Sequence, residues 1–154
     1  MKITAAIAFL VACLGAGLLG ALFIQPRLSG WYGELRHPSW APPQRLFAPA
    51  WTLLYILMAA SAWIVWISGR AGRSQAIGLF LGQLLLNLLW PALFFGLRRM
   101  DWALAEMALL WLAVAGTMIS FWRLSSTAAI LLAPYLAWVT FAFFLNRAYW
   151  TLNR

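Results

Sequence analysis

The side chains that carry out polar catalysis or bind metals are few in this sequence and far apart. His37 is the only histidine, Cys13 is the only cysteine, and three residues are acidic. A zinc site or a Ser/His hydrolase needs several such groups together, and one cysteine cannot form an intrachain disulfide or a cysteine cluster for zinc. We therefore expect no metal site, and no acid/base pair supports hydrolysis or another polar reaction.

Aromatic side chains are the abundant chemical groups, with 11 tryptophans, 10 phenylalanines and 4 tyrosines. Three segments carry aromatic and amide side chains at intervals of three or four residues, which places each set on one face of a helix. The sets are Trp51, Tyr55, Met58 and Ala62; Gln83, Asn87, Trp90 and Phe94; and Tyr135, Trp138, Ala142 and Asn146. If these faces meet, they form a cavity that offers indole rings for stacking and amides for hydrogen bonds.

Two other interpretations of these residues need no ligand. Tryptophans gather at both surfaces of a membrane, and seven of them, near the ends of apolar runs, fit that role: Trp31, Trp40, Trp63, Trp66, Trp102, Trp122 and Trp150. The deeper ones, which fit it less well, are Trp51, Trp90, Trp111 and Trp138. A buried indole N–H needs a partner, and Gln83 or Asn87 can supply one without any ligand.

The elements that must hold these residues are membrane helices. Of the 154 residues, 65% are hydrophobic and only 9% are charged, whereas soluble domains carry about 25% charged residues. Five apolar runs, at 3–24, 46–68, 74–97, 102–122 and 126–150, each have about the 20 residues that cross a bilayer. The first run exceeds the apolar core of a signal peptide, about 7–15 residues, so we expect it to be retained. The sequence predicts an all-α membrane bundle, a single domain over residues 1–154.

The one long connection between these runs, residues 25–45, contains the stretch "WYGELRHPSWAPP" at 31–43. The prolines at 38, 42 and 43 keep it non-helical and fairly stiff, while Trp31 and Trp40 can anchor it among the lipid headgroups. We predict that this segment is a lid over the cavity, formed by Trp31, His37, Pro38, Trp40 and Pro43.

The net charge of +8 is distributed between the apolar runs rather than along one face. We therefore interpret it as a signal for membrane orientation and not for nucleic acid. One side of the membrane receives Lys2, Arg70, Arg73 and Arg123, and the other receives Arg27, Arg36, Arg45, Arg98, Arg99, Arg147 and Arg154. The richer side should be cytoplasmic, which places the long loop and the carboxyl terminus inside and the amino terminus outside. This rule does not apply to an outer membrane.

Glycine patterns within the runs have more than one interpretation. "GAGLLG" at 15–20 matches a dinucleotide-binding pattern, but it lies inside an apolar helix instead of after a strand. Its small residues are expected to let another helix approach closely. Gly78 and Gly82 form a G-x-x-x-G pattern, which either marks a dimer interface or serves packing within one molecule.

Two sets of polar residues near the run ends are also ambiguous. Leu145, Tyr149 and Arg154 fit a loose cholesterol pattern, and the alternative is a Tyr/Arg anchor at the interface. Glu106 is either a functional acid or the partner of Arg98 or Arg99, and we expect the pairing.

Four motifs together resemble the TspO/MBR family, the tryptophan-rich sensory proteins whose mitochondrial members are translocator proteins or peripheral benzodiazepine receptors. They are "WYGELRHPSWAPP" followed by Phe47, "WTLLYILM" at 51–58, "GQLLLNLLWPALFFG" at 82–96 and "PYLAWVTFAFFLN" at 134–146. The resemblance spans nearly the whole chain. It implies a five-helix bundle, usually dimeric, that binds porphyrins and synthetic aromatic ligands under the first loop, while eukaryotic members also bind cholesterol.

By the same resemblance, seven residues match pocket positions: Tyr32, Pro42, Trp51, Asn87, Trp90, Trp138 and Ala142. Trp51 and Trp138 match the tryptophans tied to light-dependent breakdown of protoporphyrin. No cofactor is expected to be required, and the expected ligand is a porphyrin such as protoporphyrin IX or a haem-like molecule.

Three functions remain open at this point. The first is a membrane receptor for porphyrins and related aromatic molecules, involved in stress sensing and tetrapyrrole regulation. The second is a transporter of such molecules or of lipid-like ones, and the third is a light-dependent porphyrin-degrading protein. We expect membrane lipid, a hydrophobic small molecule and a second copy of the chain as partners. The expected location is a bacterial inner membrane, with the outer membrane as the alternative.

Overall fold

The computed structural model describes residues 2–154 and contains five long helices that are apolar enough to cross a membrane. They are α1 (Lys2–Leu28), α3 (Phe47–Ile67), α4 (Arg73–Pro91), α5 (Met100–Trp122) and α6 (Ser126–Leu152). Three short helices join them: α2 (Trp31–Glu34), the 3₁₀-helix η1 (Gln44–Leu46) and the π-helix η2 (Ala92–Gly96). These residues include no strand, so the predicted all-α membrane fold is confirmed.

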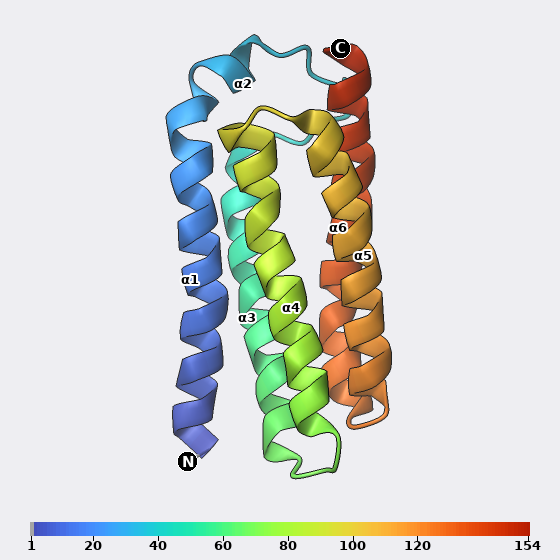
Figure 1. Cartoon of the computed structure of the whole chain (residues 1–154). Helices are drawn as coiled ribbons and strands as arrows, with labels where there is room; N and C mark the ends of the chain where they lie inside the picture. Colours follow the sequence, from blue (N-terminus) through green and yellow to red (C-terminus); the bar gives the residue numbers. More distant parts are fainter. Residues whose placement is uncertain (1) are drawn as a thin grey trace.

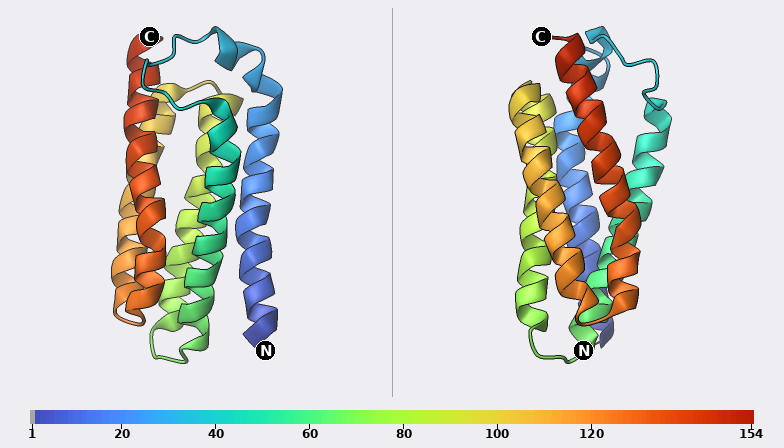
Figure 2. Two further views of the ribbon diagram at one scale, coloured as in Figure 1. Left: turned by 180° about the vertical axis from the view of Figure 1, so that it is seen from behind. Right: turned by 90° about the vertical axis from the view of Figure 1, so that its right-hand side faces the viewer.

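The long helices lie side by side and surround a common axis (Figures 1 and 2). Helix α1 packs against α3 and α4, α3 packs against α6, α6 against α5, and α5 against α4, which closes the ring. The amino terminus lies at one end of the bundle, and the segment with α2 lies at the other end, beside the carboxyl terminus (Figure 1). The first loop and the chain end therefore lie at the same end of the bundle.

Glycines of α1 allow the close approach that the sequence indicated. A Cβ atom added to Gly17 would lie 2.5 Å from the Tyr55 ring, and one added to Gly20 would lie 3.3 Å from Pro91. Because these contacts join α1 to α3 and α4, small residues at these two positions determine how tightly α1 packs on the bundle.

Two turns at the end opposite α2 are tied together. Gly69 and Gly72 adopt positive φ angles of 66° and 86°, which permits the tight turn between α3 and α4. Arg70 in that turn donates from its guanidinium to the Leu124 carbonyl at 2.6 Å, and the Ser125 side chain caps the start of α6. One hydrogen bond therefore joins the two turns at this end of the bundle.

The helix boundaries at the other end differ from the predicted ones in two places. Helix α1 continues past Pro26 to Leu28, because a proline in the last turn removes only one hydrogen bond. The predicted span 74–97 changes at Pro91 into the π-helix η2, where the Leu97 amide donates to the Ala92 carbonyl at 2.8 Å. The wider turn buries both Phe94 and Phe95, although they are consecutive residues.

Candidate ligand-binding site

A cavity of about 530 Å³ lies in the half of the bundle next to α2, and all five long helices contribute to its wall. The lining residues are Leu14, Gly17, Leu18, Gly20, Ala21, Ile24, Gln25 and Leu28 of α1; Tyr32 of α2; Gln44 of η1; Phe47, Ala48, Trp51, Thr52 and Tyr55 of α3; Asn87, Trp90 and Pro91 of α4; Phe94 and Phe95 of η2; Met107 and Leu110 of α5; and Trp138, Ala142, Leu145, Asn146 and Tyr149 of α6. The wall is mostly apolar and aromatic, with a few amides and hydroxyls.

Six of the seven predicted pocket residues lie in this wall: Tyr32, Trp51, Asn87, Trp90, Trp138 and Ala142. The seventh, Pro42, is half-buried in the loop and is not among the lining residues. The parts of the three stripes nearer α2 therefore face one space, whereas Met58, Ala62, Gln83 and Tyr135 do not line it.

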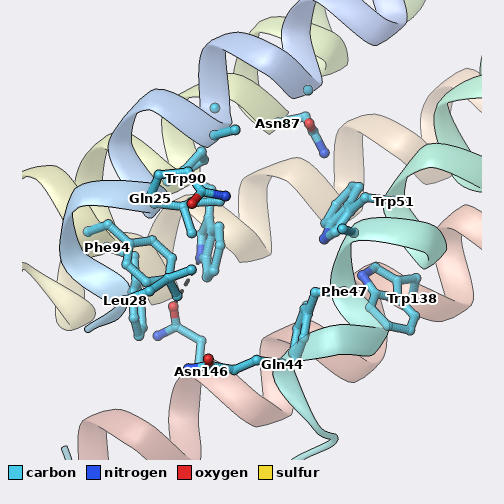
Figure 3. A pocket seen from close by; sticks show the side chains of 18 of the residues that line it. Gln25, Leu28, Gln44, Phe47, Trp51, Asn87, Trp90, Phe94, Trp138 and Asn146 are labelled. Carbon is cyan, nitrogen blue, oxygen red and sulfur yellow. Dashed lines mark hydrogen bonds between the residues drawn. The ribbon is translucent and has the colours of Figure 1, made fainter. Parts of the chain in front are cut away.

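Aromatic rings flank the cavity on two opposite sides (Figure 3). On one side Trp51 and Trp138 meet edge to face, with ring centroids 6.3 Å apart, and Phe47 lies 5.9 Å from Trp138. On the other side Trp90 stacks on Phe94 at 5.1 Å. The space between these two sides is a slot bounded by flat apolar surfaces.

The inner end of the slot is closed by hydrogen-bonded polar groups. The Tyr55 hydroxyl donates to Asn87 Oδ1 at 2.6 Å, and Asn87 Nδ2 donates to the Tyr135 hydroxyl at 3.1 Å. The Tyr135 hydroxyl in turn donates to Gln83 Oε1 at 2.8 Å. The amides of Asn87 and Gln83 thus bind tyrosine hydroxyls.

The suggestion that these two amides serve buried indoles is therefore wrong. The Trp90 indole donates to Asn146 Oδ1 at 3.0 Å, and the Trp111 indole donates to Thr140 Oγ1 at 2.8 Å. Both partners come from α6, whose polar side chains lie next to these rings. The two α4 amides instead form hydrogen bonds with tyrosine hydroxyls of α3 and α6.

The predicted lid segment is bound to the last turns of α6. The hydroxyls of Tyr32 and Tyr149 are 2.7 Å apart and share a hydrogen bond, and His37 Nδ1 lies 2.8 Å from the same Tyr149 hydroxyl. The Asn153 side chain accepts from the Arg36 amide at 2.8 Å and donates to the Arg36 carbonyl at 3.1 Å. Burial raises the pKa of Tyr32, and its hydrogen bond with Tyr149 acts in the same direction, so this hydroxyl stays protonated.

The other predicted lid residues differ in how far they are buried. Pro38 is buried, while His37, Trp40 and Pro43 are exposed. The Trp31 ring packs 5.9 Å from Phe94, and the Trp40 ring packs 5.9 Å from Phe141. The segment therefore covers the end of the bundle where the aromatic walls terminate.

Comparison with known proteins decides the family. The TspO/MBR family model matches residues 8–151. The chain belongs to the TspO/MBR family. Protein CrtK of Rhodobacter capsulatus is 40% identical over 157 residues, which cover 99% of this chain and 95% of that protein. Translocator protein of Bos taurus is 40% identical over 141 residues (90% and 83%), and a tryptophan-rich sensory protein of Cereibacter sphaeroides is 41% identical over 145 residues (94% and 89%).

In this TspO/MBR member, the three residues of the cholesterol pattern do not form one surface that faces lipid. Leu145 and Tyr149 are buried, with 6% and 3% of their surface exposed, and both line the cavity. Arg154 lies over the Trp150 ring at 5.4 Å. Tyr149 is thus a contact of the lid, and Arg154 contacts Trp150 instead of Tyr149.

The expected pairing of Glu106 with Arg98 or Arg99 is wrong. Arg99 forms a salt bridge with Asp101 at 2.7 Å, and Arg98 lies over the Trp31 ring at 5.8 Å. Because Glu106 lies more than one turn deeper in α5, it is buried, and its carboxylate oxygens have no hydrogen-bond partner among residues 2–154. Asp101 is closer to Arg99 in sequence, and its side chain is partly exposed, so Arg99 pairs with Asp101 instead.

The glycine pair of α4 is not needed for packing within one molecule. Gly78 and Gly82 are exposed, and a Cβ atom added to either would meet nothing within 4 Å. Both line a shallow groove on the outside of the bundle, together with Gln75, Leu79, Gln83, Leu86 and Ala113. Of the two interpretations of this pattern, packing inside the monomer is therefore excluded.

Several cavity residues were not singled out from the sequence. The α1 wall repeats at intervals of three or four residues through Leu14, Leu18, Ala21, Gln25 and Leu28, a spacing that was visible but lay in a uniformly apolar run. Phe95 reaches the cavity only because of the π-helix, and Asn153, which binds the lid, had no sequence signal.

Proposed function

We propose that this TspO/MBR member is a membrane receptor for porphyrins and related flat, hydrophobic aromatic molecules. The observation that carries the proposal is the slot between Trp51 with Trp138 on one side and Trp90 with Phe94 on the other. Its volume of about 530 Å³ falls within the range of small-molecule sites, about 300–1,000 Å³. Ring stacking adds about 0.5–1.5 kcal/mol beyond the burial of apolar area.

The polar groups of the site suit a flat ligand with carboxylates at one edge. Gln25 and Gln44 line the end of the cavity near the lid, whereas the Asn146 amide beside them already donates to the Met100 carbonyl at 2.9 Å. Arg36 and His37 lie in the lid itself, on the exposed surface. A porphyrin ring in the slot would direct its propionates toward these donors, since charged groups are costly in the apolar half of the site.

Binding of protoporphyrin IX to the purified protein, measured by quenching of tryptophan fluorescence and by the shift of porphyrin absorbance, tests the proposal. Trp51→Phe and Trp138→Phe should weaken binding. Trp63→Phe is the matched control, because the Trp63 indole donates to the Lys2 carbonyl at the far end of the bundle. An equal loss of porphyrin binding in all three variants would mean that the porphyrin binds at the membrane surface and not in the slot.

A second candidate, light-dependent porphyrin breakdown, is supported by the aromatic contacts of Trp51. Its ring lies 6.3 Å from Trp138 and stacks on Tyr55 at 5.5 Å, so an oxidised indole would have neighbours that share the charge. Porphyrin loss in light and in darkness separates this activity from binding alone. Flux of porphyrin across sealed vesicles tests the remaining alternative, transport.

We further propose how the molecule sits in its membrane. The chain is an integral membrane protein whose close relatives include bacterial proteins, and we assign it to a bacterial inner membrane. The end with the lid and the carboxyl terminus carries the larger number of arginines and would face the cytoplasm. Two copies would associate through the exposed glycines Gly78 and Gly82 on α4.

A further inference from the structure

A row of four aromatic rings leads from the cavity to the exposed surface of the lid. Trp51 meets Trp138 with ring centroids 6.3 Å apart, and Trp138 lies 5.6 Å from Phe141. Phe141 lies 5.9 Å from Trp40, which is 50% exposed and lies outside the membrane-spanning helices. Because only Trp51 and Trp138 line the cavity, this aromatic row joins the ligand site to a surface that water-soluble molecules can reach.

The three indoles of the aromatic row can exchange electrons, because indole is oxidised more easily than benzene. Phe141 is not oxidised itself, but its ring fills the gap between Trp138 and Trp40. An electron that leaves Trp51 can therefore be replaced from Trp138, and then from Trp40. The ring contacts provide a path for charge in addition to the packing of α6 against the lid.

The tyrosines beside Trp51 do not provide a second path. Tyr55 and Tyr135 lie 5.5 and 6.3 Å from the Trp51 ring, but a tyrosine is oxidised readily only when a base takes its hydroxyl proton. The Tyr55 hydroxyl donates to Asn87 Oδ1, and the Tyr135 hydroxyl donates to Gln83 Oε1. Both acceptors are amide oxygens, which form hydrogen bonds but do not take up the proton.

The positive charge left on an oxidised indole is more stable at Trp40 than in the cavity wall. The cavity is lined mostly by apolar groups, and the lining residues within 2–154 include no acidic side chain, so a charge there is costly. At the exposed Trp40, water solvates the charge and can accept the indole proton. The charge should therefore move outward along the row.

Aromatic rings on the opposite side of the slot also reach the lid, but a cation lies over their last ring. Trp90 stacks on Phe94, and Phe94 lies 5.9 Å from Trp31. The Arg98 guanidinium lies over Trp31 at 5.8 Å and opposes a second positive charge on that ring. No guanidinium within residues 2–154 lies over Trp40 in this way.

The surface around Trp40 favours negatively charged molecules. Arg36 and Arg45 are exposed in the same loop, and the end of the bundle with the lid carries seven of the 11 basic residues. A basic surface raises the local concentration of anions and speeds their approach. An anionic reductant would therefore meet Trp40 more often than a neutral one.

We propose that Trp40 is the site at which a water-soluble, anionic one-electron reductant delivers electrons to the aromatic row, so that light drives electrons from this reductant to a porphyrin in the slot. This inference rests on the light-dependent activity proposed above. Trp51 gives one electron to the excited porphyrin, Trp138 replaces it, and Trp40 replaces the electron of Trp138. Oxidised Trp40 releases its indole proton to water, then takes one electron from the reductant and one proton from water.

The electron count closes with dioxygen as the final acceptor. The reduced porphyrin passes its extra electron to dioxygen, so one superoxide forms for each reductant molecule that loses one electron. The indoles and the porphyrin return to their starting states. The chain would thus act as a light-driven electron-transfer protein, and the same path would repair Trp51 after each turnover.

Laser-flash absorption of the full chain in lipid nanodiscs, with protoporphyrin IX as the light absorber and ascorbate as the reductant, tests the path. In the parent, the tryptophan radical should decay faster as ascorbate is raised. Trp40→Phe should form the radical in the same initial yield, but its decay should lose the dependence on ascorbate. Trp150→Phe is the matched control at the same end of the bundle, half-buried under Arg154 and outside the row, and should behave as the parent does.

Two results would overturn the proposal. One is a decay in Trp40→Phe that ascorbate quickens as much as in the parent. The other is a loss of the ascorbate effect in Trp31→Phe with none in Trp40→Phe, which would make the opposite side of the slot the exit. Porphyrin absorbance measured on each variant should show equal binding, so that loss of the ligand is excluded as the cause.

A second light absorber separates this inference from the proposed function. If the parent does not bind protoporphyrin IX, or binds it and forms no radical, the porphyrin function concerned fails. The row is then tested with a photo-oxidising ruthenium complex on Thr52→Cys in a Cys13→Ala background, since Thr52 is exposed and lines the cavity. Ascorbate should shorten the radical lifetime only when Trp40 is present, and an equal shortening in Trp40→Phe would overturn the path.

Discussion

At the scale of single residues, the tryptophans have different roles, and their spacing in the sequence distinguishes these roles only in part. Trp66 and Trp102 lie under the guanidinium groups of Arg73 and Arg99, at 5.0 and 5.2 Å, as expected of residues at a membrane surface. Trp51 lies inside the cavity wall. Depth along the helix was enough to separate these two groups from the sequence. It was not enough to identify hydrogen-bond partners, because those depend on which helices are neighbours.

Substitution of the two facing indoles should affect binding and photochemistry to different extents. Trp51→Phe and Trp138→Phe keep an aromatic ring but lose area and the indole N–H, so protoporphyrin IX affinity should fall only several-fold, as expected for about 1 kcal/mol. Light-dependent porphyrin loss should fall much more, because indole is oxidised more easily than benzene. Fluorescence titration and illuminated absorbance time courses measure the two effects. Parallel losses in binding and breakdown would argue against a photochemical role for these rings.

Replacement of Asn87 should change ligand preference as well as stability. Asn87→Leu removes the group that accepts from Tyr55 and donates to Tyr135, and the stranded hydroxyls should cost about 1–3 kcal/mol. Ligands that carry a carbonyl acceptor should bind more weakly, while ligands that lack one should be spared. A diaryl ketone and the diarylmethane of the same skeleton provide the comparison, with thermal unfolding measured alongside. An equal loss for both ligands would assign Asn87 a purely structural role.

At the scale of elements, the long helices could be predicted because hydropathy and length determine a membrane span almost alone. The π-helix η2 could not. Residues 74–97 were expected to form one regular span, because the hydrogen bonds that form after Pro91 depend on packing of Phe94 and Phe95 against α1, α2 and α5. The loop was predicted to be a lid, yet its attachment was missed, because the Arg36 backbone and Asn153 are 117 positions apart.

The attachment of the lid should control how fast ligands enter and leave. Tyr149→Phe removes the hydroxyl that contacts both Tyr32 and His37, and Asn153→Ala removes both bonds to the Arg36 backbone. Each should speed porphyrin dissociation about 2–10-fold, the value of one or so net hydrogen bonds, with a smaller change in association. Stopped-flow fluorescence measures the rates. Trp150→Phe, on the next residue of α6, is the control, and a dissociation rate like that of the parent in the first two variants would show that the lid does not gate the site.

At the scale of the whole molecule, all five helices are needed to form the site. The cavity has walls from each of them, and the bundle is closed at one end by Arg70 and at the other by the lid. The sequence predicted that three stripes would meet but missed the fourth wall from α1. In α1, the residues that face lipid and the residues that face the cavity do not differ in polarity, because both surroundings are apolar.

Association of two molecules should depend on the bare face of α4. Gly82→Leu adds a side chain where the monomer has open space, so the monomer should fold normally while the close approach of a second helix is blocked. Size-exclusion chromatography with light scattering in mild detergent should show a shift toward monomers. Porphyrin affinity should stay close to that of the parent, since Gly82 does not line the cavity. A dimer that survives Gly78→Leu with Gly82→Leu would place the interface elsewhere.

The distribution of arginines should determine which end of the molecule faces the cytoplasm. Four basic residues lie at the end with the amino terminus and seven at the end with the lid, out of 11 in total. Such an excess near short loops retains the richer end inside the cell. In a Cys13→Ala background, Ala71→Cys in the turn between α3 and α4 should react with a membrane-impermeant maleimide on cells whose outer membrane alone is permeable. Ser29→Cys beside the lid should react only after the inner membrane is opened as well. Both positions are exposed, so the reverse labelling order would invert the orientation and place the lid, and with it the entrance to the slot, on the outer side.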